Sequence, residues 1–431
     1  MGKPASGSRR FLKLAGMTAS VAGRYAGSKL MGLVQSAEGA SLARAAAHAR
    51  NGEAIARTLG ELKGAVMKVG QMASLAGEVL PKEVVAALGT LQREAPPMPF
   101  ETIAAQIERE LGRSPDALFE RFDRAPWAAA SIGQVHRARL DGREVVVKVQ
   151  YPGVDESADS DLAQLKLALR ASGLVQVPKE ALDELFAELR DRLREELDYG
   201  LEAENVRVFR AFHRERHPFV VVPEPIGERS TRRVLTLAWE PGDSLGALPA
   251  ASYGQAVRDR IGEHLVRAFL AQLFELHAIQ ADPNPANFAA RLDGTLVLYD
   301  FGCVKRIPDE VLAPWKGTLR AALDEEWEAV DRCLIELGVR RPDGPPPGAD
   351  FYAAWRAIFA EPLLTPGYDF GASRIAEKTM ALAPRFFARL DSFQPAARIA
   401  YLDRAIAGHF GNLRNLGVRG SFGPILRAYL E

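Results

Sequence analysis

Apolar residues recur three or four positions apart in several stretches of the chain, and this spacing predicts helices with one buried face. Pro81 closes the first of these regions. The stretches are residues 54–77, about 101–111, 158–171, 180–212, 255–279 and most of the chain after 309, apart from the loop at 342–348.

The segment from Pro126 to Val149 has a different pattern. The dipeptide Asp141-Gly142 is typical of a two-residue hairpin turn, and the run that follows it is apolar and β-branched. We therefore expect strand, tight loop, strand, turn and strand. Short apolar runs predict further strands at 220–222, 233–237 and 296–299.

A strand-rich segment between helices, followed by a helical half, predicts an α+β fold of two lobes with a cleft between them. We expect four regions along the chain. They are a basic leader over 1–53, a helical extension over 54–112, a small sheet-containing lobe over 113–240 and a mostly helical lobe over 241–431.

Composition narrows the class of protein. The 431 residues are 47% hydrophobic and 26% charged, which excludes a fibre or a mainly disordered chain. Lys and Arg number 55, as do Asp and Glu, so no overall field recruits nucleic acid. Cys303 and Cys333 cannot make a disulfide framework or a four-cysteine zinc site. With no apolar run long enough for a transmembrane helix, the chain reads as a cytoplasmic protein.

Residues 1–50 differ from this neutral average, because they hold eight Lys or Arg residues and a single acid, Glu38. Apolar residues recur among these charges every three to five positions. A basic amphipathic segment can lie on an anionic membrane surface, so peripheral membrane binding is one expectation. A solvated leader is the alternative.

Four features that suit phosphate chemistry follow one another in the sequence. Lys148 ends an apolar strand, from which it can reach a phosphate as a point charge. Asp282 and Asn287 lie in a segment whose prolines exclude a regular helix. Asp300 follows the strand at 296–299 and begins an Asp-Phe-Gly sequence, a position suited to a metal-facing carboxylate.

Helix geometry separates the acids between 196 and 205. At about 100° per residue on one continuous helix, Asp198, Glu202 and Asn205 share a face and Glu196 lies away from Glu202. Glu196 and Glu202 should therefore not serve the same lysine. Farther on, His213 and His217 have a spacing that could seat a metal, but the charged run around them predicts a solvated helix end.

The order of strand lysine, loop Asp and Asn, and Asp-Phe-Gly resembles the protein-kinase-like superfamily, and more specifically the UbiB family of atypical kinases. The resemblance covers about residues 55–310. Its motifs are Lys68-Val69-Gly70-Gln71, Ala128-Ala129-Ala130-Ser131 where ordinary kinases have glycines, Val149-Gln150-Tyr151-Pro152-Gly153-Val154, Glu196-Leu197-Asp198 and Glu202-Ala203-Glu204-Asn205.

The resemblance implies that the protein binds ATP or ADP with Mg²⁺. Asp300 and Asn287 would be the Mg²⁺ ligands, and both offer the hard oxygen donors that this ion prefers. Lys148 would contact the α- and β-phosphates, and Glu202 would hold Lys148 in place. Asp282 would act as the base or orient the attacking group.

The resemblance also assigns the nucleotide loop to Ala128, Ala129, Ala130 and Ser131. Methyl groups restrict φ there and limit how closely the backbone approaches phosphate, so nucleotide selectivity should differ from that of glycine-loop kinases. The segment around Glu240 follows a strand where kinases place the hinge, so its backbone groups should meet adenine.

A regulatory part is implied as well. The motif containing Lys68 and Gln71 would fold over the cleft, with Lys68 paired to Glu196 or Asp198 of the Glu-x-Asp motif. Lys68 would then restrain the site without performing chemistry.

The resemblance implies a Mg²⁺-dependent kinase or ATPase that supports ubiquinone or other isoprenoid-lipid metabolism at a membrane surface, with a lipid or quinone-precursor ligand. The catalytic loop departs from the family pattern His-Ala-Asp-Pro-His-Pro-Gly-Asn, because both histidines and the glycine are replaced in residues 280–287. A nucleotide-binding regulator with little turnover is therefore an alternative. A protein kinase is a weaker one, because Gly302 is followed almost directly by a predicted helix.

Overall fold

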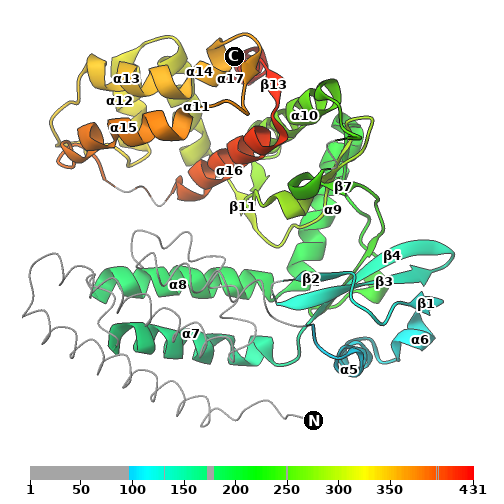
Figure 1. Cartoon of the computed structure of the whole chain (residues 1–431). Coiled ribbons are helices and arrows are strands. Elements are labelled where there is room, and N and C mark those ends of the chain that lie inside the picture. Colours follow the sequence, from blue (N-terminus) through cyan, green and yellow to red (C-terminus); the bar gives the residue numbers. More distant parts are fainter. Residues whose placement is uncertain (1–96, 131, 172–178, 249–250, 395, 397) are drawn as a thin grey trace, which may run out of the picture. The chain divides into compact units, whose positions relative to one another are not determined.

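The computed structural model describes residues 97–130, 132–171, 179–248, 251–394, 396 and 398–431. The described residues fall into two compact units (Figure 1). The first unit contains those up to Ala203 together with Pro225–Trp239, and the second contains Glu204–Glu224 and Glu240–Glu431. The basic leader, the helix expected at 54–77 and its Lys68 and Gln71, and Ser131 lie outside the described residues.

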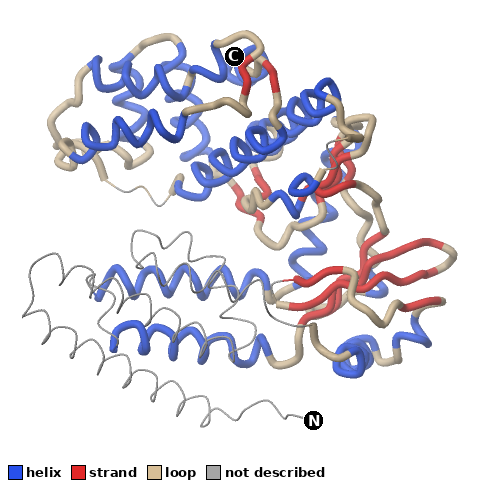
Figure 2. Tube along the Cα trace, in the orientation of Figure 1, coloured by secondary structure: helices blue, strands red, loops and turns tan. Residues whose placement is uncertain are grey.

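The first unit is built on an antiparallel sheet (Figure 2). Its strands run in the order β1-β3-β4-β6, and β2 pairs with β3. The expected series of strand, tight loop, strand, turn and strand is confirmed, with Asp141 and Gly142 at positive φ in the hairpin turn. The strands are β1 Arg121–Phe122, β2 Ala128–Ala130, β3 Gly133–Leu140, β4 Arg143–Gln150 and β6 Val234–Ala238.

The alternation along β4 places its lysine. Val145, Val147 and Val149 are buried on one face of the strand, so Lys148 lies on the other face. Gly133 lets β3 begin close to β4, because a Cβ atom there would lie 2.2 Å from the carbonyl oxygen of Val149.

Among the described residues of the first unit, four helices accompany this sheet, and α5 packs against β4 with Ile103 and Ile107 fully buried. Helices α7 and α8 run side by side (Figure 1) and are linked by ion pairs, such as Lys166 with Asp183 at 2.7 Å. The four are α5 Phe100–Leu111, α6 Pro115–Leu118, α7 Val154–Ala171 and α8 Lys179–Glu196.

The expectation of one continuous helix over 180–212 is wrong. Helix α8 ends at Glu196, and a new helix, α9, runs from Tyr199 to Arg216. The cause is the side chain of Asp198, which accepts the backbone N–H groups at the start of α9 and so caps a new helix. The shared face expected for Asp198 and Glu202 on one helix is therefore not found.

The second unit is mostly helical, with fully buried side chains such as Leu273, Ile279 and Leu402 in one core. Two short sheets lie beside this core, in the orders β5-β10-β9-β7 and β11-β8, and β12 pairs with β13. The elements are β5 Val220–Val221, β7 Asp243–Ser244, α10 Gln255–Phe274, β8 Ala278–Gln280, β9 Phe288–Ala290, β10 Leu296–Leu298, β11 Val304–Arg306, α11 Asp309–Leu323, α12 Trp327–Glu336, α13 Ala349–Phe359, α14 Glu361–Leu364, β12 Tyr368–Asp369, α15 Ile375–Phe387, α16 Ala400–Leu416, β13 Arg419–Gly420 and α17 Gly423–Leu430.

The helix expected over 255–279 ends five residues early, at Phe274. His277 has a φ of 52°, which a continuing right-handed helix does not allow. Residues 278–280 then form β8, which pairs with β11 and brings the following loop toward the Asp-Phe-Gly segment.

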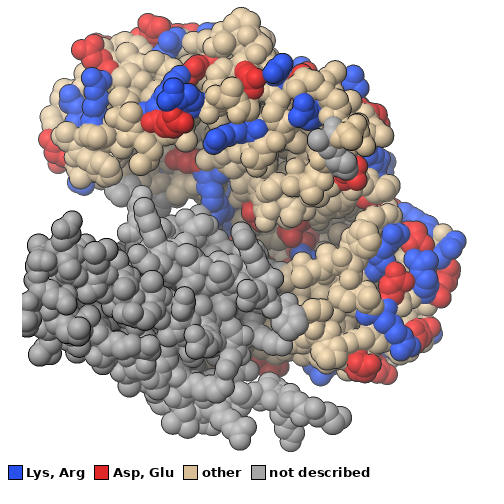
Figure 3. Space-filling model, viewed as in Figure 1, with Lys and Arg blue, Asp and Glu red and all other residues tan. Residues whose placement is uncertain are grey.

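The surface charges agree with the neutral composition. Figure 3 shows basic and acidic side chains interspersed over the end of the sheet formed by β1 and the β3–β4 hairpin, where Arg121 pairs with Asp123 and Glu144. Within the described part of the chain, none of the helices combines the length and apolarity that crossing a bilayer requires.

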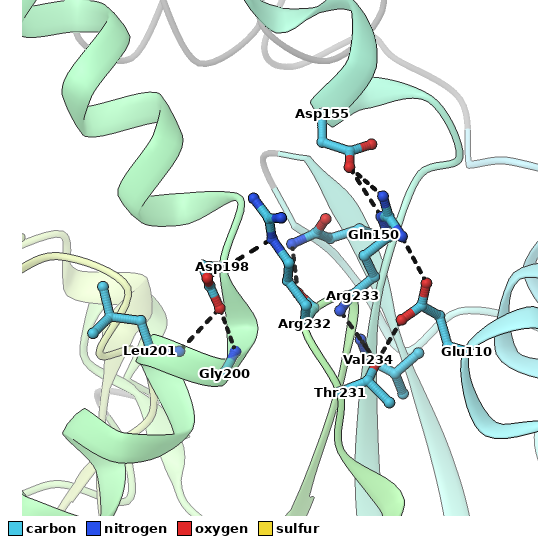
Figure 4. Close-up of polar contacts among 10 residues, drawn as sticks. All are labelled: Glu110, Gln150, Asp155, Asp198, Gly200, Leu201, Thr231, Arg232, Arg233 and Val234. Carbon is cyan, nitrogen blue, oxygen red and sulfur yellow. Dashed lines mark hydrogen bonds and ion pairs between the residues drawn. The ribbon is translucent and has the colours of Figure 1, made fainter.

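One arginine ties two helices of the first unit, α5 and α7, to its sheet (Figure 4). The Arg233 guanidinium donates to Glu110 of α5 at 2.9 Å and to Asp155 of α7 at 3.0 Å. Both carboxylates are largely buried, with 11% and 15% of the side chain exposed. Removing the guanidinium would leave both without their cation.

We therefore expect Arg233→Ala to lower the free energy of unfolding by about 2 kcal/mol, because two largely buried carboxylates lose a charged donor. Chemical denaturation of the full chain measures this. Arg194→Ala is the matched control, since the Arg194–Asp159 pair is more than half exposed and its loss should change the free energy of unfolding much less. Equal effects of the two substitutions would contradict the expectation.

Candidate active site

In the first unit, Lys148 and Glu202 form an ion pair. The Lys148 Nζ lies 2.9 and 2.8 Å from the two Glu202 carboxylate oxygens. Only 3% of the Glu202 side chain and 17% of the Lys148 side chain are exposed. The structure thus joins the two residues that the sequence suggested as partners, and their catalytic roles stay predictions.

Tyr199, the first residue of α9, also contacts this lysine. Its ring centroid lies 4.8 Å from Lys148 Nζ, a distance at which the ring face attracts a cation. Tyr199 is 1% exposed, so the contact is shielded from water. The sequence analysis missed Tyr199, because nothing in its local pattern marks it as a partner of a strand 50 residues earlier.

In the second unit, strand pairing brings two loops together. The loop at 281–287 connects β8 to β9, and the Asp-Phe-Gly loop connects β10 to β11. Because β8 pairs with β11 and β9 pairs with β10, the two loops are held next to each other at both ends. Backbone bonds from Ala281 N to Cys303 O, 2.8 Å, and from Tyr299 N to Asn287 O, 3.0 Å, fix their register.

Asp282 and Asn287 contact each other within the first of these loops. The Asn287 amide nitrogen donates to Asp282 Oδ2 at 2.9 Å and to the Asp282 carbonyl oxygen at 3.2 Å. This use of the nitrogen leaves Oδ1 as the Asn287 atom that could face a cation. The turn between them is stabilised by Asn284, whose side chain accepts the Ala286 N–H at 3.1 Å.

Asp300 is held through both its backbone and its side chain. Its Oδ1 accepts the Gly302 N–H at 2.9 Å, and its carbonyl oxygen accepts the Gln280 amide at 2.7 Å. The next residue, Phe301, is fully buried, with its ring centroid 4.9 Å from that of Phe209 in α9. Asn205 Nδ2 donates to the Phe301 carbonyl oxygen at 3.0 Å. These contacts fix the backbone on both sides of the Asp300 carboxylate.

Gln280 stands where the resembled family has a histidine, and it starts a buried polar chain. Its backbone N–H donates to Gln272 Oε1 at 3.2 Å, and Gln272 Nε2 lies 3.2 Å from His213 Nε2. Because the amide nitrogen can only donate, this imidazole nitrogen is the acceptor and the ring is neutral. Burial, with the nearby His217, lowers the pKa of His213 to about 3.

The expectation of a solvated helix end around these histidines is therefore wrong. His213 is fully buried and His217 is 9% exposed. Aromatic neighbours such as Phe212 and Phe219 cover the two histidines. The charged residues between them in the sequence did not indicate this burial.

Helix α16 supports the loop at 281–287 from far along the chain. Arg404 donates to the Ala281 carbonyl oxygen at 3.1 Å, and Asn412 donates to that of Pro283 at 2.9 Å. Gly408 allows this close packing, because a Cβ there would lie 2.1 Å from the Pro283 ring. Sequence reasoning missed these residues, since α16 lies more than a hundred positions downstream and carries no recognisable motif.

The alanine segment is a strand and not the loop that we expected. Ala128, Ala129 and Ala130 form β2, paired with residues 133–135 of β3. Extended backbone accommodates a methyl group at every position, which explains why alanine is tolerated there. A nucleotide role for the segment stays a prediction.

Glu240 lies beside the residue that precedes Asp300. Its carbonyl oxygen accepts the Tyr299 hydroxyl at 2.8 Å, and its carboxylate lies 2.7 Å from Arg291 Nη2. Burial raises the pKa of Tyr299 to about 12, so the hydroxyl stays a donor. These contacts anchor the segment after β6 to the strand that leads into the Asp-Phe-Gly loop.

The structure describes the two acids that were expected to regulate the site, Glu196 and Asp198. Glu196 is the last residue of α8, and Asp198 caps α9. Their expected partner, Lys68, lies outside the described residues, so the Lys68 pairing stays a prediction.

The oxygen donors of the second unit fit a magnesium ion bound together with a nucleotide. In the described part of the chain, no three His, Cys, Asp or Glu side chains group tightly enough to hold a metal by themselves. Mg²⁺ commonly takes only one or two carboxylates and completes its coordination with water and phosphate oxygens. Asp300, with Asn287, offers such a set.

Three features are typical of a protein-kinase-like chain. They are a strand lysine paired to a helix glutamate, the loop with Asp282 and Asn287, and Asp300 before Phe-Gly. Residues 90–334, more than half of the chain, match the ABC1 atypical kinase-like domain. The chain belongs to this family of atypical kinases, also called UbiB.

Individual relatives agree with this assignment. Atypical kinase COQ8, mitochondrial, of Saccharomyces cerevisiae is 35% identical over 67% of this chain and 57% of its own length. Protein ACTIVITY OF BC1 COMPLEX KINASE 8, chloroplastic, of Arabidopsis thaliana is 34% identical over 64% of this chain and 37% of its own length. The chain therefore spans less than two thirds of either curated relative.

A solved structure shows the same fold. The complex of Rv3197 with erythromycin from Mycobacterium tuberculosis has a TM-score of 0.62 and 27% sequence identity, and the match covers 85% of this chain and 92% of that chain. The α+β, kinase-like fold expected from the sequence is confirmed.

The buried histidines predict how stability depends on pH. The pKa of His213 is lowered to about 3 and that of His409, also by burial, to about 4, below the ordinary value of 6.5. Between these values and about 6.5 the unfolded chain binds more protons than the folded one. The contribution of these two histidines to the free energy of unfolding should therefore be fully present above about pH 6.5 and fall as the pH drops, by up to about 1.4 kcal/mol per pH unit for each histidine.

Denaturation of wild type and His213→Gln at a series of pH values measures this slope. The variant keeps a hydrogen-bonding side chain but loses one titrating group, so its slope below pH 6.5 should be shallower, whatever its absolute stability. His277→Gln, at a half-exposed position, is the control for replacing a histidine by glutamine. An unchanged slope in His213→Gln would contradict the assignment.

Proposed function

We propose that this protein binds a nucleotide with Mg²⁺ and cleaves or transfers its terminal phosphoryl group, as a UbiB-type atypical kinase or ATPase. We further propose that it supports ubiquinone or other isoprenoid-lipid metabolism at a membrane surface. Its substrate would then be a lipid or a quinone-precursor-like phenol, and not a protein.

One observation carries the catalytic part of this proposal. Strand pairs at both ends hold the loop with Asp282 and Asn287 against the loop with Asp300. Phosphoryl transfer needs charge neutralisation and positioning more than covalent chemistry, and preformed carboxylates on fixed loops suit that requirement.

The proposed roles follow from the chemistry of each group. Asp300 and Asn287 would hold Mg²⁺, which neutralises charge on the phosphates when it is bound. Lys148, fixed by Glu202, would bind phosphate oxygens as a point charge. Asp282, held by the Asn287 amide, would accept a proton from the attacking hydroxyl or water, or orient it.

The path after the Asp-Phe-Gly segment favours a small substrate over a protein. Gly302 leads directly into β11, which pairs with β8, and α11 begins at Asp309. The six residues between them leave no room for a long activation loop.

A second candidate function rests on the altered catalytic loop. Gln280 and Asn284 replace the family's histidines, and both side chains are used in hydrogen bonds that shape the loop. A nucleotide-binding regulator with little turnover would keep this architecture. Phosphate release measured alongside nucleotide binding separates the two functions, because the regulator would bind without releasing phosphate.

The metal role of Asp300 predicts that Asp300→Asn weakens binding of Mg²⁺–ADP by about tenfold or more, because a carboxylate ligand is lost. Calorimetric titration in Mg²⁺ and in EDTA measures this, and only the wild type should respond strongly to the metal. Asp309→Asn, a highly exposed acid nine residues later, is the control. Equal affinities of Asp300→Asn and wild type would refute the metal assignment.

The basic residues of 1–50 support the membrane part of the proposal. Each basic side chain near an anionic surface contributes about 1 kcal/mol, and salt screens this attraction. Replacing Lys3, Arg9, Arg10 and Lys13 by Gln should reduce co-sedimentation with anionic vesicles and the sensitivity of binding to salt. Binding equal to that of the unchanged chain would show that this segment does not direct the protein to membranes.

A further inference from the structure

We propose that Asp198 is a positioning residue whose side-chain oxygen, and not its charge, holds the first turn of α9 so that Glu202 meets Lys148. This inference rests on the proposed function only for its effect on nucleotide binding. The sequence analysis instead treated Asp198 as one acid of the Glu-x-Asp motif and expected Lys68 to pair with Asp198 or Glu196.

Asp198 occupies the break between α8 and α9 and satisfies the start of the new helix. Its Oδ1 accepts the backbone N–H groups of Gly200 at 2.9 Å and Leu201 at 3.1 Å. Its carbonyl oxygen accepts the Glu202 N–H at 3.2 Å. A helix leaves its first N–H groups without intrahelical partners, and this side chain supplies two of the missing acceptors.

The turn that Asp198 caps carries two side chains that contact Lys148. Tyr199 offers its ring at 4.8 Å, and Glu202 offers its two oxygens at 2.8 and 2.9 Å. Both residues are almost fully buried, so neither can follow the lysine by moving into solvent. Fraying of this single turn would therefore separate Lys148 from its carboxylate.

The same turn is fixed to the backbone segment that pairs with β4 (Figure 4). Tyr199 N donates to the Arg232 carbonyl oxygen at 2.9 Å, and Gln150 N donates to that of Arg233 at 3.0 Å. Gln150 ends the strand that carries Lys148. The strand that carries Lys148 and the helix that carries Glu202 are thus both bonded to adjacent residues of one short segment. The cap at Asp198 then holds the first turn of α9 in the position that this bonding sets.

Charge contributes little to this role. The nearest described cation, the Arg232 guanidinium, lies 3.7 Å from Asp198 Oδ2, and the two side chains are 61% and 41% exposed. Exposed ion pairs of this kind contribute little to stability. Asparagine offers the same acceptor oxygen and caps helices as well as aspartate does. A capping role and a charge-pairing role therefore predict opposite outcomes for the same substitution.

The experiment compares Asp198→Asn with Asp198→Ala in the full chain. Asp191→Ala, which removes an exposed acid from α8, is the matched control. Two readouts do not depend on activity. They are amide hydrogen exchange at residues 200–202 and the rate at which an amine-reactive reagent labels Lys148, both followed by mass spectrometry. The affinity for Mg²⁺–ADP is the third readout.

For Asp198→Ala we expect exchange at 200–202 and labelling of Lys148 to rise about fivefold, the effect of losing a helix cap, with nucleotide affinity weakened to match. Asp198→Asn should stay within about twofold of wild type in all three measurements. The rescue by asparagine distinguishes the cap from a charge partner.

Two results would overturn the proposal. If Asp198→Asn were as damaging as Asp198→Ala, the charge would be the active feature. If Asp198→Ala behaved like Asp191→Ala, the cap would not control the Lys148–Glu202 pair. A full chain that bound no nucleotide would refute the proposed function, but exchange and labelling would still decide the role of Asp198.

Discussion

The first unit depends on one requirement, that the Lys148 ammonium and the Glu202 carboxylate meet where little water reaches them. A buried charge without its partner is far more costly than an exposed one, so strand and helix must keep a fixed register. The valine alternation of β4 sets the face of the lysine, and the break at Asp198 sets the start of the helix that carries the glutamate. The backbone of Arg232 and Arg233 accepts hydrogen bonds from the start of this helix and from the end of β4.

In the second unit, the candidate site residues are oriented by hydrogen bonds and not by a buried ion pair between them. Its three oxygen-bearing residues, Asp282, Asn287 and Asp300, are oriented by backbone pairing and by hydrogen bonds from the Asn287 amide to Asp282 and from the Gly302 N–H to Asp300. Support from α16 arrives through carbonyl oxygens of the loop, so it fixes the backbone without neutralising the side chains.

The sequence predicted much of this and missed identifiable parts. The hairpin strands, the helices and the order of Lys148, Asp282, Asn287 and Asp300 follow from local patterns and motif spacing. The break at Asp198 was missed because apolar spacing continues across it, and a capping side chain acts against that spacing. The supports from Tyr199, Arg404 and Asn412 depend on tertiary contacts between distant segments, which no local pattern encodes. The burial of His213 was missed for the same reason.

The glutamine at position 280 has a further consequence. A histidine there, as in the family pattern, would change its hydrogen-bonding capacity with every proton it gained near neutral pH. An amide carries no titrating proton, and its neighbours Gln272 and the neutral His213 do not titrate near neutral pH either. The bond from Gln280 to the Asp300 backbone therefore holds with the same strength in mildly acidic and in neutral surroundings. Gln280 thus gives the Asp-Phe-Gly loop a support whose hydrogen-bonding capacity does not depend on the gain or loss of a proton near neutral pH.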